Sequence, residues 1–259
     1  MNHKSPRDPS LIQRIFPRQK RKQQTSPIVL QLCEYFFVCG ETDFSSSEVL
    51  WQQLIEDWKL SVEEVAYINR QQGTTCMNCH NNLRSIALAK AIVTKYNFKG
   101  SLSCFLNTSI GKNLKILSVN TAGGLHKTLN KVKNYKLAEF PEHDMTNLGF
   151  EDGTFDLVIH SDTLEHVPSP LLGLQECRRV LADGGSCIFT IPIIIGRLSV
   201  DRKGKKASYH GNSDTLANDW AVQTEYGADA WTDGFRAGFS NVQIHCLEYP
   251  SAFAMQLNK

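Results

Sequence analysis

Hydrophobic positions recur at helical spacing between residues 45 and 96. The pattern predicts three helices, which begin near Ser45, Ser61 and Asn81. Ser45 and Ser61 are each followed three residues later by a glutamate, which is the capping-box pattern of a helix start. Gly73 is placed to end the second of these helices. The first hundred residues therefore predict an α-rich unit.

The pattern changes from residue 114 onward, where short apolar runs alternate with helical segments. Strands are predicted at residues 114–119, 135–140, 155–160, 186–191, 241–248 and 251–256. Strands that alternate with helices build a parallel sheet through crossover connections. The sequence thus predicts an α/β domain over residues 112–259, preceded by a small cysteine-containing domain over residues 28–100.

Composition supports a folded chain with a full core. Hydrophobic residues make up 41% and charged residues 21% of the 259 residues, which is the usual globular mix. The longest apolar run, at residues 187–196, has about half of the roughly twenty residues that a membrane-spanning helix needs. We therefore expect no membrane span.

The amino-terminal 27 residues differ in charge from the rest of the chain. They hold seven Lys and Arg against one acid, so their net charge is +6 and the rest of the chain carries −4. This segment predicts a solvated, disordered basic tail, and the alternative is an arm that binds nucleic acid or an anionic membrane. It lacks the apolar core of a secretory signal, so we expect a cytoplasmic protein with reduced thiols.

Four of the eight cysteines fall before residue 80 and predict a structural zinc site with Cys33, Cys39, Cys76 and Cys79 as ligands. Cys76 and Cys79 have the spacing of half a site, whereas five residues separate Cys33 from Cys39, where two to four are usual. His80 or a distant group could replace Cys33. A redox pair or packed free thiols are the alternatives. Four thiolates would leave no open position on the metal, which makes the predicted zinc-ribbon or treble-clef-like site structural.

In an open parallel sheet, ligands bind at the carboxyl ends of the strands. Candidate ligand-binding residues lie at or after the ends of three predicted strands: Asn120, Ala122, Gly123 and Gly124, then Glu139, Asp144 and Met145, then His160, Ser161 and Asp162. Glycines let a ligand approach the backbone at a helix N-terminus, although an ordinary tight turn also uses them. A carboxylate such as Glu139 can accept hydrogen bonds from ribose hydroxyls.

Two segments at residues 155–167 and 178–185 carry a family resemblance. They have the sequences Phe-Asp-Leu-Val-Ile-His-Ser-Asp-Thr-Leu-Glu-His-Val and Arg-Arg-Val-Leu-Ala-Asp-Gly-Gly. With these motifs the chain resembles the class I S-adenosylmethionine-dependent methyltransferases of the type 11 group, over roughly residues 112–256. The resemblance implies a Rossmann-like, seven-stranded, mostly parallel sheet whose last two strands are antiparallel.

The same resemblance implies roles for the candidate residues around S-adenosylmethionine. Gly123 and Gly124 face the methionine part, Glu139 the ribose, Asp144 with Met145 the adenine, and His160, Ser161 and Asp162 line the pocket. The chain departs from the family at the end of the first strand, where Ser118-Val119-Asn120 replaces the usual acidic residue. Glu139 and Asp144 are only five residues apart, so the helix and strand that usually separate these two roles are shortened or absent.

His166 and Asp162 are the candidate catalytic residues, because a histidine can accept a proton from a hydroxyl acceptor near neutral pH. The alternative for His166 is that it only orders the loop after the strand. The predicted function is transfer of a methyl group to a small-molecule or glycan-like acceptor. A non-catalytic scaffold that keeps the fold is the alternative.

Other functions and partners are disfavoured. The third strand lacks a following Asn/Asp-Pro-Pro-Tyr motif, which argues against methylation of nucleic-acid amines. A nicotinamide-dependent oxidoreductase needs a G-x-G-x-x-G motif after the first strand, and only Gly123-Gly124 is present. The sequence gives no indication of the oligomeric state.

Overall fold

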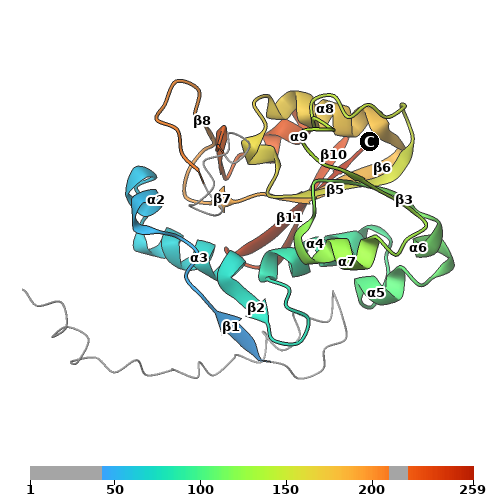
Figure 1. The fold of residues 1–259 in the computed structure, drawn as a ribbon, viewed down its shortest axis with the longest axis horizontal. Coiled ribbons are helices and arrows are strands. Elements are labelled where there is room, and N and C mark those ends of the chain that lie inside the picture. The colour runs from blue at the N-terminus through green and yellow to red at the C-terminus, as the bar shows by residue number, and fades with distance from the viewer. Residues whose placement is uncertain (1–42, 210–220) are drawn as a thin grey trace, which may run out of the picture.

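A six-stranded sheet lies at the centre of the computed structural model, which describes residues 43–209 and 221–259 (Figure 1). The strand order is β10-β11-β6-β5-β3-β4. The strands are β3 (Lys115–Val119), β4 (Asn134–Ala138), β5 (Phe155–Ser161), β6 (Leu181–Thr190), β10 (Asn241–Glu248) and β11 (Ala252–Asn258). Strands β4, β3, β5 and β6 are parallel, whereas β11 and β10 form the predicted antiparallel pair at the end of the chain.

The prediction of seven strands is wrong for the described part of the chain, because the main sheet ends at β4. Residues 139–154, which follow β4, contain turns and an isolated bridge between Asp144 and Asn147. This connection to β5 is too short to hold both a crossover helix and a further parallel strand. In residues 43–209 and 221–259, the sheet therefore lacks the edge strand that the family resemblance implies.

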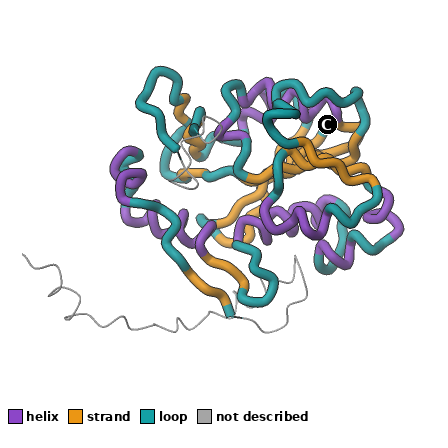
Figure 2. Tube along the Cα trace, viewed as in Figure 1, coloured by secondary structure: helices purple, strands orange, loops and turns teal. Residues whose placement is uncertain are grey.

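Two layers of helices cover the sheet (Figure 2). Helices α8 (Pro170–Val180) and α9 (Thr232–Arg236) lie on one face. The other face carries α4 (Leu83–Lys95), α5 (Leu102–Phe105), α6 (Ser109–Asn113) and α7 (His126–Leu129). This is the layered arrangement expected when strands and helices alternate along a chain.

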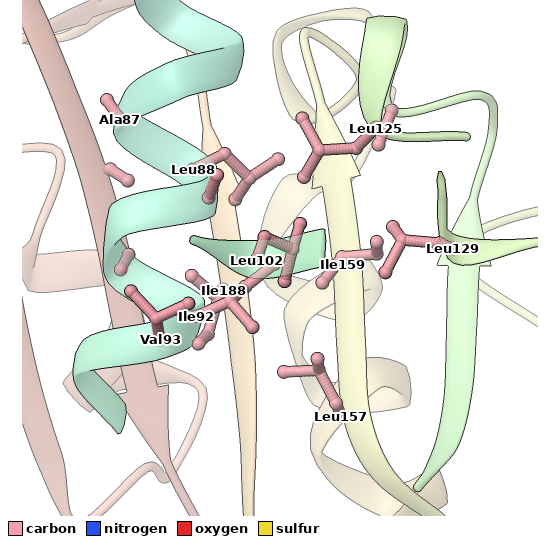
Figure 3. Packing of buried hydrophobic residues seen from close by; sticks show 14 of the residues in the cluster. Ala87, Leu88, Ile92, Val93, Leu102, Leu125, Leu129, Leu157, Ile159 and Ile188 are labelled. Carbon is pink, nitrogen blue, oxygen red and sulfur yellow. The ribbon is translucent and has the colours of Figure 1, made fainter. Parts of the chain in front are cut away.

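Helix α4 belongs to the core of the sheet, although the sequence places it in the small amino-terminal domain. It packs against β6, β10 and β11, and nine of its residues are buried. Figure 3 shows Leu88 and Ile92 in one packed layer with Ile159 and Ile188 of the sheet. A helix that is apolar on most of its surface is stable only when neighbours cover it.

The segment before α4 contains a small two-stranded sheet and two helices: β1 (Phe44–Ser46), α2 (Gln52–Asp57), α3 (Val62–Gly73) and β2 (Thr74–Cys76). The capping box at Ser61 is confirmed, since Ser61 Oγ accepts the Glu64 N–H and Glu64 accepts the Ser61 N–H. The helix predicted from Ser45 begins only at Gln52, as α2, because Ser45 pairs with Thr75 in the two-stranded sheet. Gly73 ends α3 as predicted, and a Cβ there would lie 1.9 Å from the Ser47 carbonyl oxygen.

A second, small sheet follows β6 and is made of β7 (Ile193–Ile194), β8 (Val200–Asp201) and β9 (Thr224–Gly227). It lies on the same side of the molecule as α2 and α3 (Figure 1). An ion pair joins Arg197 to Glu64 at 2.6 Å, and the Trp58 indole donates to Ser208 Oγ at 2.7 Å. No helix within residues 43–209 and 221–259 is long and apolar enough to cross a membrane.

Candidate active site

The loop after β3 is tied to the end of β4 by Asn120. This residue has a left-handed backbone with φ 58°. Its N–H donates to the Ala138 carbonyl at 2.8 Å, and its side-chain oxygen accepts the Phe140 N–H at 3.2 Å. The fully buried Ser118 donates its hydroxyl to the Asn120 carbonyl at 2.7 Å. The serine that replaces the expected acid thus holds the loop in place.

The two glycines of this loop lie against the first turn of α4. The loop forms a short 3-10 helix, η3 (Gly123–Leu125), and Gly123 has φ 52°. A Cβ at Gly124 would lie 1.7 Å from Asn81 Oδ1, and one at Gly123 would lie 3.2 Å from Ser85 Oγ. An alanine at residue 124 would therefore force the Asn81 side chain or the loop to move.

Helix α4 begins beside this loop and presents a buried arginine there. Asn82 caps the helix, since its side chain accepts the Ser85 N–H at 2.9 Å. Arg84, in the first turn, forms an ion pair with Asp162, and their side chains are 15% and 19% exposed. Burial lowers the pKa of Arg84 to about 10, so the guanidinium stays charged at neutral pH.

Asp162 follows β5 and is held by β6. Its backbone is left-handed with φ 47°, and its N–H donates to the Thr190 carbonyl at 2.9 Å. Three buried polar atoms around the Arg84–Asp162 pair have no hydrogen-bond partner among the described residues: Asn81 Oδ1, Arg84 Nε and Asp162 Oδ1. Buried polar groups are normally satisfied, so such atoms indicate a site for a ligand or water.

Glu165 and His166 occupy the next 3-10 helix, η4 (Leu164–His166). Glu165 is 1% exposed, and burial raises its pKa to about 8, against the opposing effect of Arg84. The Glu165 carbonyl accepts the Gln223 N–H at 2.7 Å, which joins η4 to the chain before β9.

His166 is oriented by the same segment. Its Nδ1 lies 3.2 Å from the Ala221 carbonyl, which can only accept, so Nδ1 carries the proton. Its Nε2 lies 3.8 Å from Glu165 Oε1. In this tautomer Nε2 of a neutral His166 can accept a proton.

The remaining predicted residues of β5 lie inside the sheet. His160 is fully buried and stacks on Phe189 with ring centroids 4.4 Å apart. Burial lowers the pKa of His160 to about 3, so its ring is neutral. The Ser161 hydroxyl is 2.8 Å from that of Thr190.

The predicted residues after β4 are more dispersed. Glu139 is exposed, directly after the strand. The exposed Asp144 accepts two hydrogen bonds at 2.7 Å from the backbone N–H and the hydroxyl of Thr146. Met145 is 4% exposed and packs against Gly173 of α8. Asp144 Oδ1 therefore stabilises its own turn, and Met145 packs in the core.

The structure describes only half of the predicted zinc site. Cys76 is buried at the end of β2, and Cys79 is half-buried in the turn that follows. Cys33 and Cys39 lie outside the described residues. Within residues 43–209 and 221–259, no group of three or more His, Cys, Asp and Glu is placed to hold a metal ion.

The comparisons with known proteins agree with the sequence motifs. Residues 99–189, just over a third of the chain, match a family model described as a methyltransferase domain. No curated protein matches the chain. The family match supports the resemblance to class I S-adenosylmethionine-dependent methyltransferases.

Three solved structures are similar to this chain at low sequence identity. A methyltransferase from Thermotoga maritima is 15% identical, with 66% of this chain and 94% of that chain covered and a TM-score of 0.35. One from Mesorhizobium loti is 13% identical, with 56% and 91% covered and a TM-score of 0.34. The 1,6-didemethyltoxoflavin-N1-methyltransferase of Burkholderia thailandensis, bound to S-adenosylhomocysteine, is 13% identical, with 61% and 76% covered and a TM-score of 0.36. These are distant likenesses and assign no substrate.

Sequence reasoning missed Asn81, Arg84 and Glu165 as site residues. Asn81 and Arg84 lie at the start of a predicted helix, where no local pattern distinguishes a site residue from a surface residue. Glu165 directly precedes the candidate His166 in the Leu-Glu-His-Val motif, and that motif is the signal that could have found it.

Proposed function

We propose that this chain is an S-adenosylmethionine-dependent methyltransferase with a small-molecule or glycan-like acceptor. The observation that supports it is the Arg84–Asp162 pair, with unsatisfied polar atoms around it and a glycine loop beside it. The methionine part of the cofactor bears one carboxylate and one ammonium group. A guanidinium and a set of carboxylate and amide oxygens at the strand ends fit both charges.

Each group then has a defined part in binding. Arg84 Nε donates to the cofactor carboxylate, and Asp162 Oδ1 and Asn81 Oδ1 accept from the ammonium group. Asp162 thus supplies the negative charge that Ser118 does not supply. The predicted contacts of Asn120, Ala122, Gly123 and Gly124 with the methionine part, of Glu139 with ribose, and of Asp144 and Met145 with adenine belong to this proposal, as do those of His160 and Ser161.

When bound, S-adenosylmethionine supplies an electrophilic methyl group. The chain supplies position and a base: the strand ends hold the reactants in line, which can account for much of the rate of a displacement. His166 Nε2 is proposed to accept the proton of a hydroxyl acceptor, because Ala221 holds the proton on Nδ1. Asp162 is the second candidate base, a role that excludes the one just given to its Oδ1, because its Oδ2 pairs with Arg84.

A labelled-methyl assay tests the proposal. Full-length protein is incubated with methyl-tritiated S-adenosylmethionine and small-molecule extracts, beside an Arg84→Met variant as the matched control. We expect label in a product with the wild-type protein and at least tenfold less with Arg84→Met. Binding of S-adenosylhomocysteine without transfer to any acceptor class would favour the scaffold alternative.

The structural zinc site with Cys33, Cys39, Cys76 and Cys79, the limit of the basic tail at residue 27, and the cytoplasmic location also remain proposals. Cys76 and Cys79 have the sequence spacing of half of such a site. Metal analysis of the purified protein tests this part, and less than about half an equivalent of zinc would contradict a four-cysteine site.

A further inference from the structure

An apolar cavity of about 220 Å³ lies between α2, α3 and the segment that follows β6. Ten of its eleven lining residues are valine, leucine, isoleucine, proline or tryptophan, and the eleventh is Gln72. Trp51 and Trp58 both line it, so we call it the Trp51–Trp58 cavity. The Trp58 indole N–H donates to Ser208 Oγ at 2.7 Å, and the Arg202 guanidinium lies over the same ring, 5.9 Å from its centroid.

The cavity is partly open to solvent and is larger than the voids of a packed interior. Protein cores contain few voids larger than a water molecule, because each one loses dispersion contacts. A cavity of about 150 Å³ lined by apolar side chains stays dry and binds benzene. The Trp51–Trp58 cavity therefore has room for a flat ring system of roughly nine or ten heavy atoms.

Two of the lining residues, Pro192 and Gln72, link the cavity to the proposed cofactor site. Pro192 lines the cavity two residues after Thr190, whose carbonyl accepts the Asp162 N–H. The Gln72 carbonyl accepts from the side chain of Asn82, the cap of α4, at 3.4 Å. The cavity thus adjoins the carboxyl ends of the strands, where the methyl donor is proposed to bind.

The lining also limits the chemistry of a ligand. None of the eleven lining residues is charged, so burial of an ionised group there would be costly. A bare sugar would lose most of its hydrogen bonds to water without replacement. The Gln72 amide offers one polar contact for a ring substituent.

We propose that the Trp51–Trp58 cavity binds a flat, uncharged ring of the methyl acceptor, with the Gln72 side chain accepting from one N–H or O–H on that ring. This inference rests on the proposed function and narrows its acceptor to molecules with an aromatic or similarly flat apolar part. Trp51 and Trp58 contribute the aromatic surface that such a ring contacts.

Calorimetric titration of the full-length protein with indole and with 1-methylindole tests the cavity without knowledge of the acceptor. Indole carries an N–H and 1-methylindole does not, and inositol serves as a polyhydroxyl control of similar size. We expect indole to bind with a dissociation constant below 1 mM, an order-of-magnitude bound for a small ring in an apolar pocket. Inositol should not bind.

Substitutions distinguish binding of indole in the cavity from general effects on the protein. Val49→Phe fills the cavity and should weaken indole binding at least tenfold, whereas Leu198→Phe adds the same ring at a residue that is 70% exposed and outside the cavity. The wild-type protein should prefer indole to 1-methylindole, because only indole can donate an N–H to the Gln72 side chain. Gln72→Leu should abolish this preference. This second variant tests the proposal even if Val49→Phe does not fold.

The same samples are titrated with S-adenosylhomocysteine, so that the two proposals fail separately. Indole binding that Val49→Phe removes, without any cofactor binding, would uphold the cavity and refute the methyltransferase. Cofactor binding without indole binding, or equal indole binding by the wild-type and Val49→Phe proteins, would show the cavity to be a packing void and overturn the inference.

Discussion

Substitution of Gly124 by alanine tests the contact between the loop after β3 and helix α4. The added Cβ would lie 1.7 Å from Asn81 Oδ1 and 2.8 Å from Asn81 Cγ, so the asparagine side chain or the loop must move. Forcing an extra methyl group into a packed site costs about 1–3 kcal/mol. The loss of glycine's freedom in the unfolded chain offsets about 0.4–1 kcal/mol of this.

We therefore expect Gly124→Ala to lower the free energy of unfolding by about 1–2 kcal/mol. Each kcal/mol corresponds to a fall in melting temperature of about 2–4 °C for a chain of this size. Gly196→Ala is the matched control, because its Cβ would have no neighbour closer than 3.8 Å. Urea unfolding of the two variants and the wild-type protein measures the difference.

A second substitution identifies the cause. Asn81→Ala removes the atoms that the new Cβ would meet. Gly124→Ala should therefore lower the free energy of unfolding much less in the Asn81→Ala protein than in the wild-type protein. Equal stability of Gly124→Ala and the wild-type protein, or additive losses in the double variant, would refute the close packing of this loop on α4.

Three further predictions concern the charged groups of the site. Glu165 has a raised pKa of about 8, so the folded protein binds more protons than the unfolded chain between about pH 5 and 8, and its stability falls as the pH rises through this range. Glu165→Gln should remove that part of the decline in urea unfolding, and an unchanged pH dependence would contradict the burial of the carboxyl group. Arg84→Met and Asp162→Asn should each destabilise the protein, and a double-mutant cycle should give a coupling of at least about 0.5 kcal/mol, whereas additive effects would deny the ion pair. His166→Ala should lower turnover more than affinity for S-adenosylhomocysteine, and equal loss of both would indicate a structural role.

The sheet and its longer helices could be predicted from the sequence because their signals are local. Periodic apolar positions predict α3 and α4, and buried runs predict the six strands of the main sheet. The failure at Ser45 shows the limit of such signals. Its capping-box pattern is present, but residues 44–46 pair with residues 74–76, and this distant pairing outweighs the local preference.

The candidate site was only partly predictable, because its central contact is non-local. Asp162 follows a strand and was a candidate on that ground, but Arg84 is 78 residues away in the sequence. No spacing rule links two such residues, and only the packing of α4 on the sheet brings them together. The cavity beside Trp51 and Trp58 likewise depends on how α2 and α3 meet the chain after β6.

Calorimetric titration of the purified full-length protein with S-adenosylhomocysteine tests the central claim most directly, because it requires the cofactor site and no knowledge of the acceptor. The account predicts one site per chain with micromolar affinity, weakened at least tenfold, or about 1.4 kcal/mol, in Arg84→Met. Absence of binding at millimolar ligand to a folded wild-type protein would contradict it.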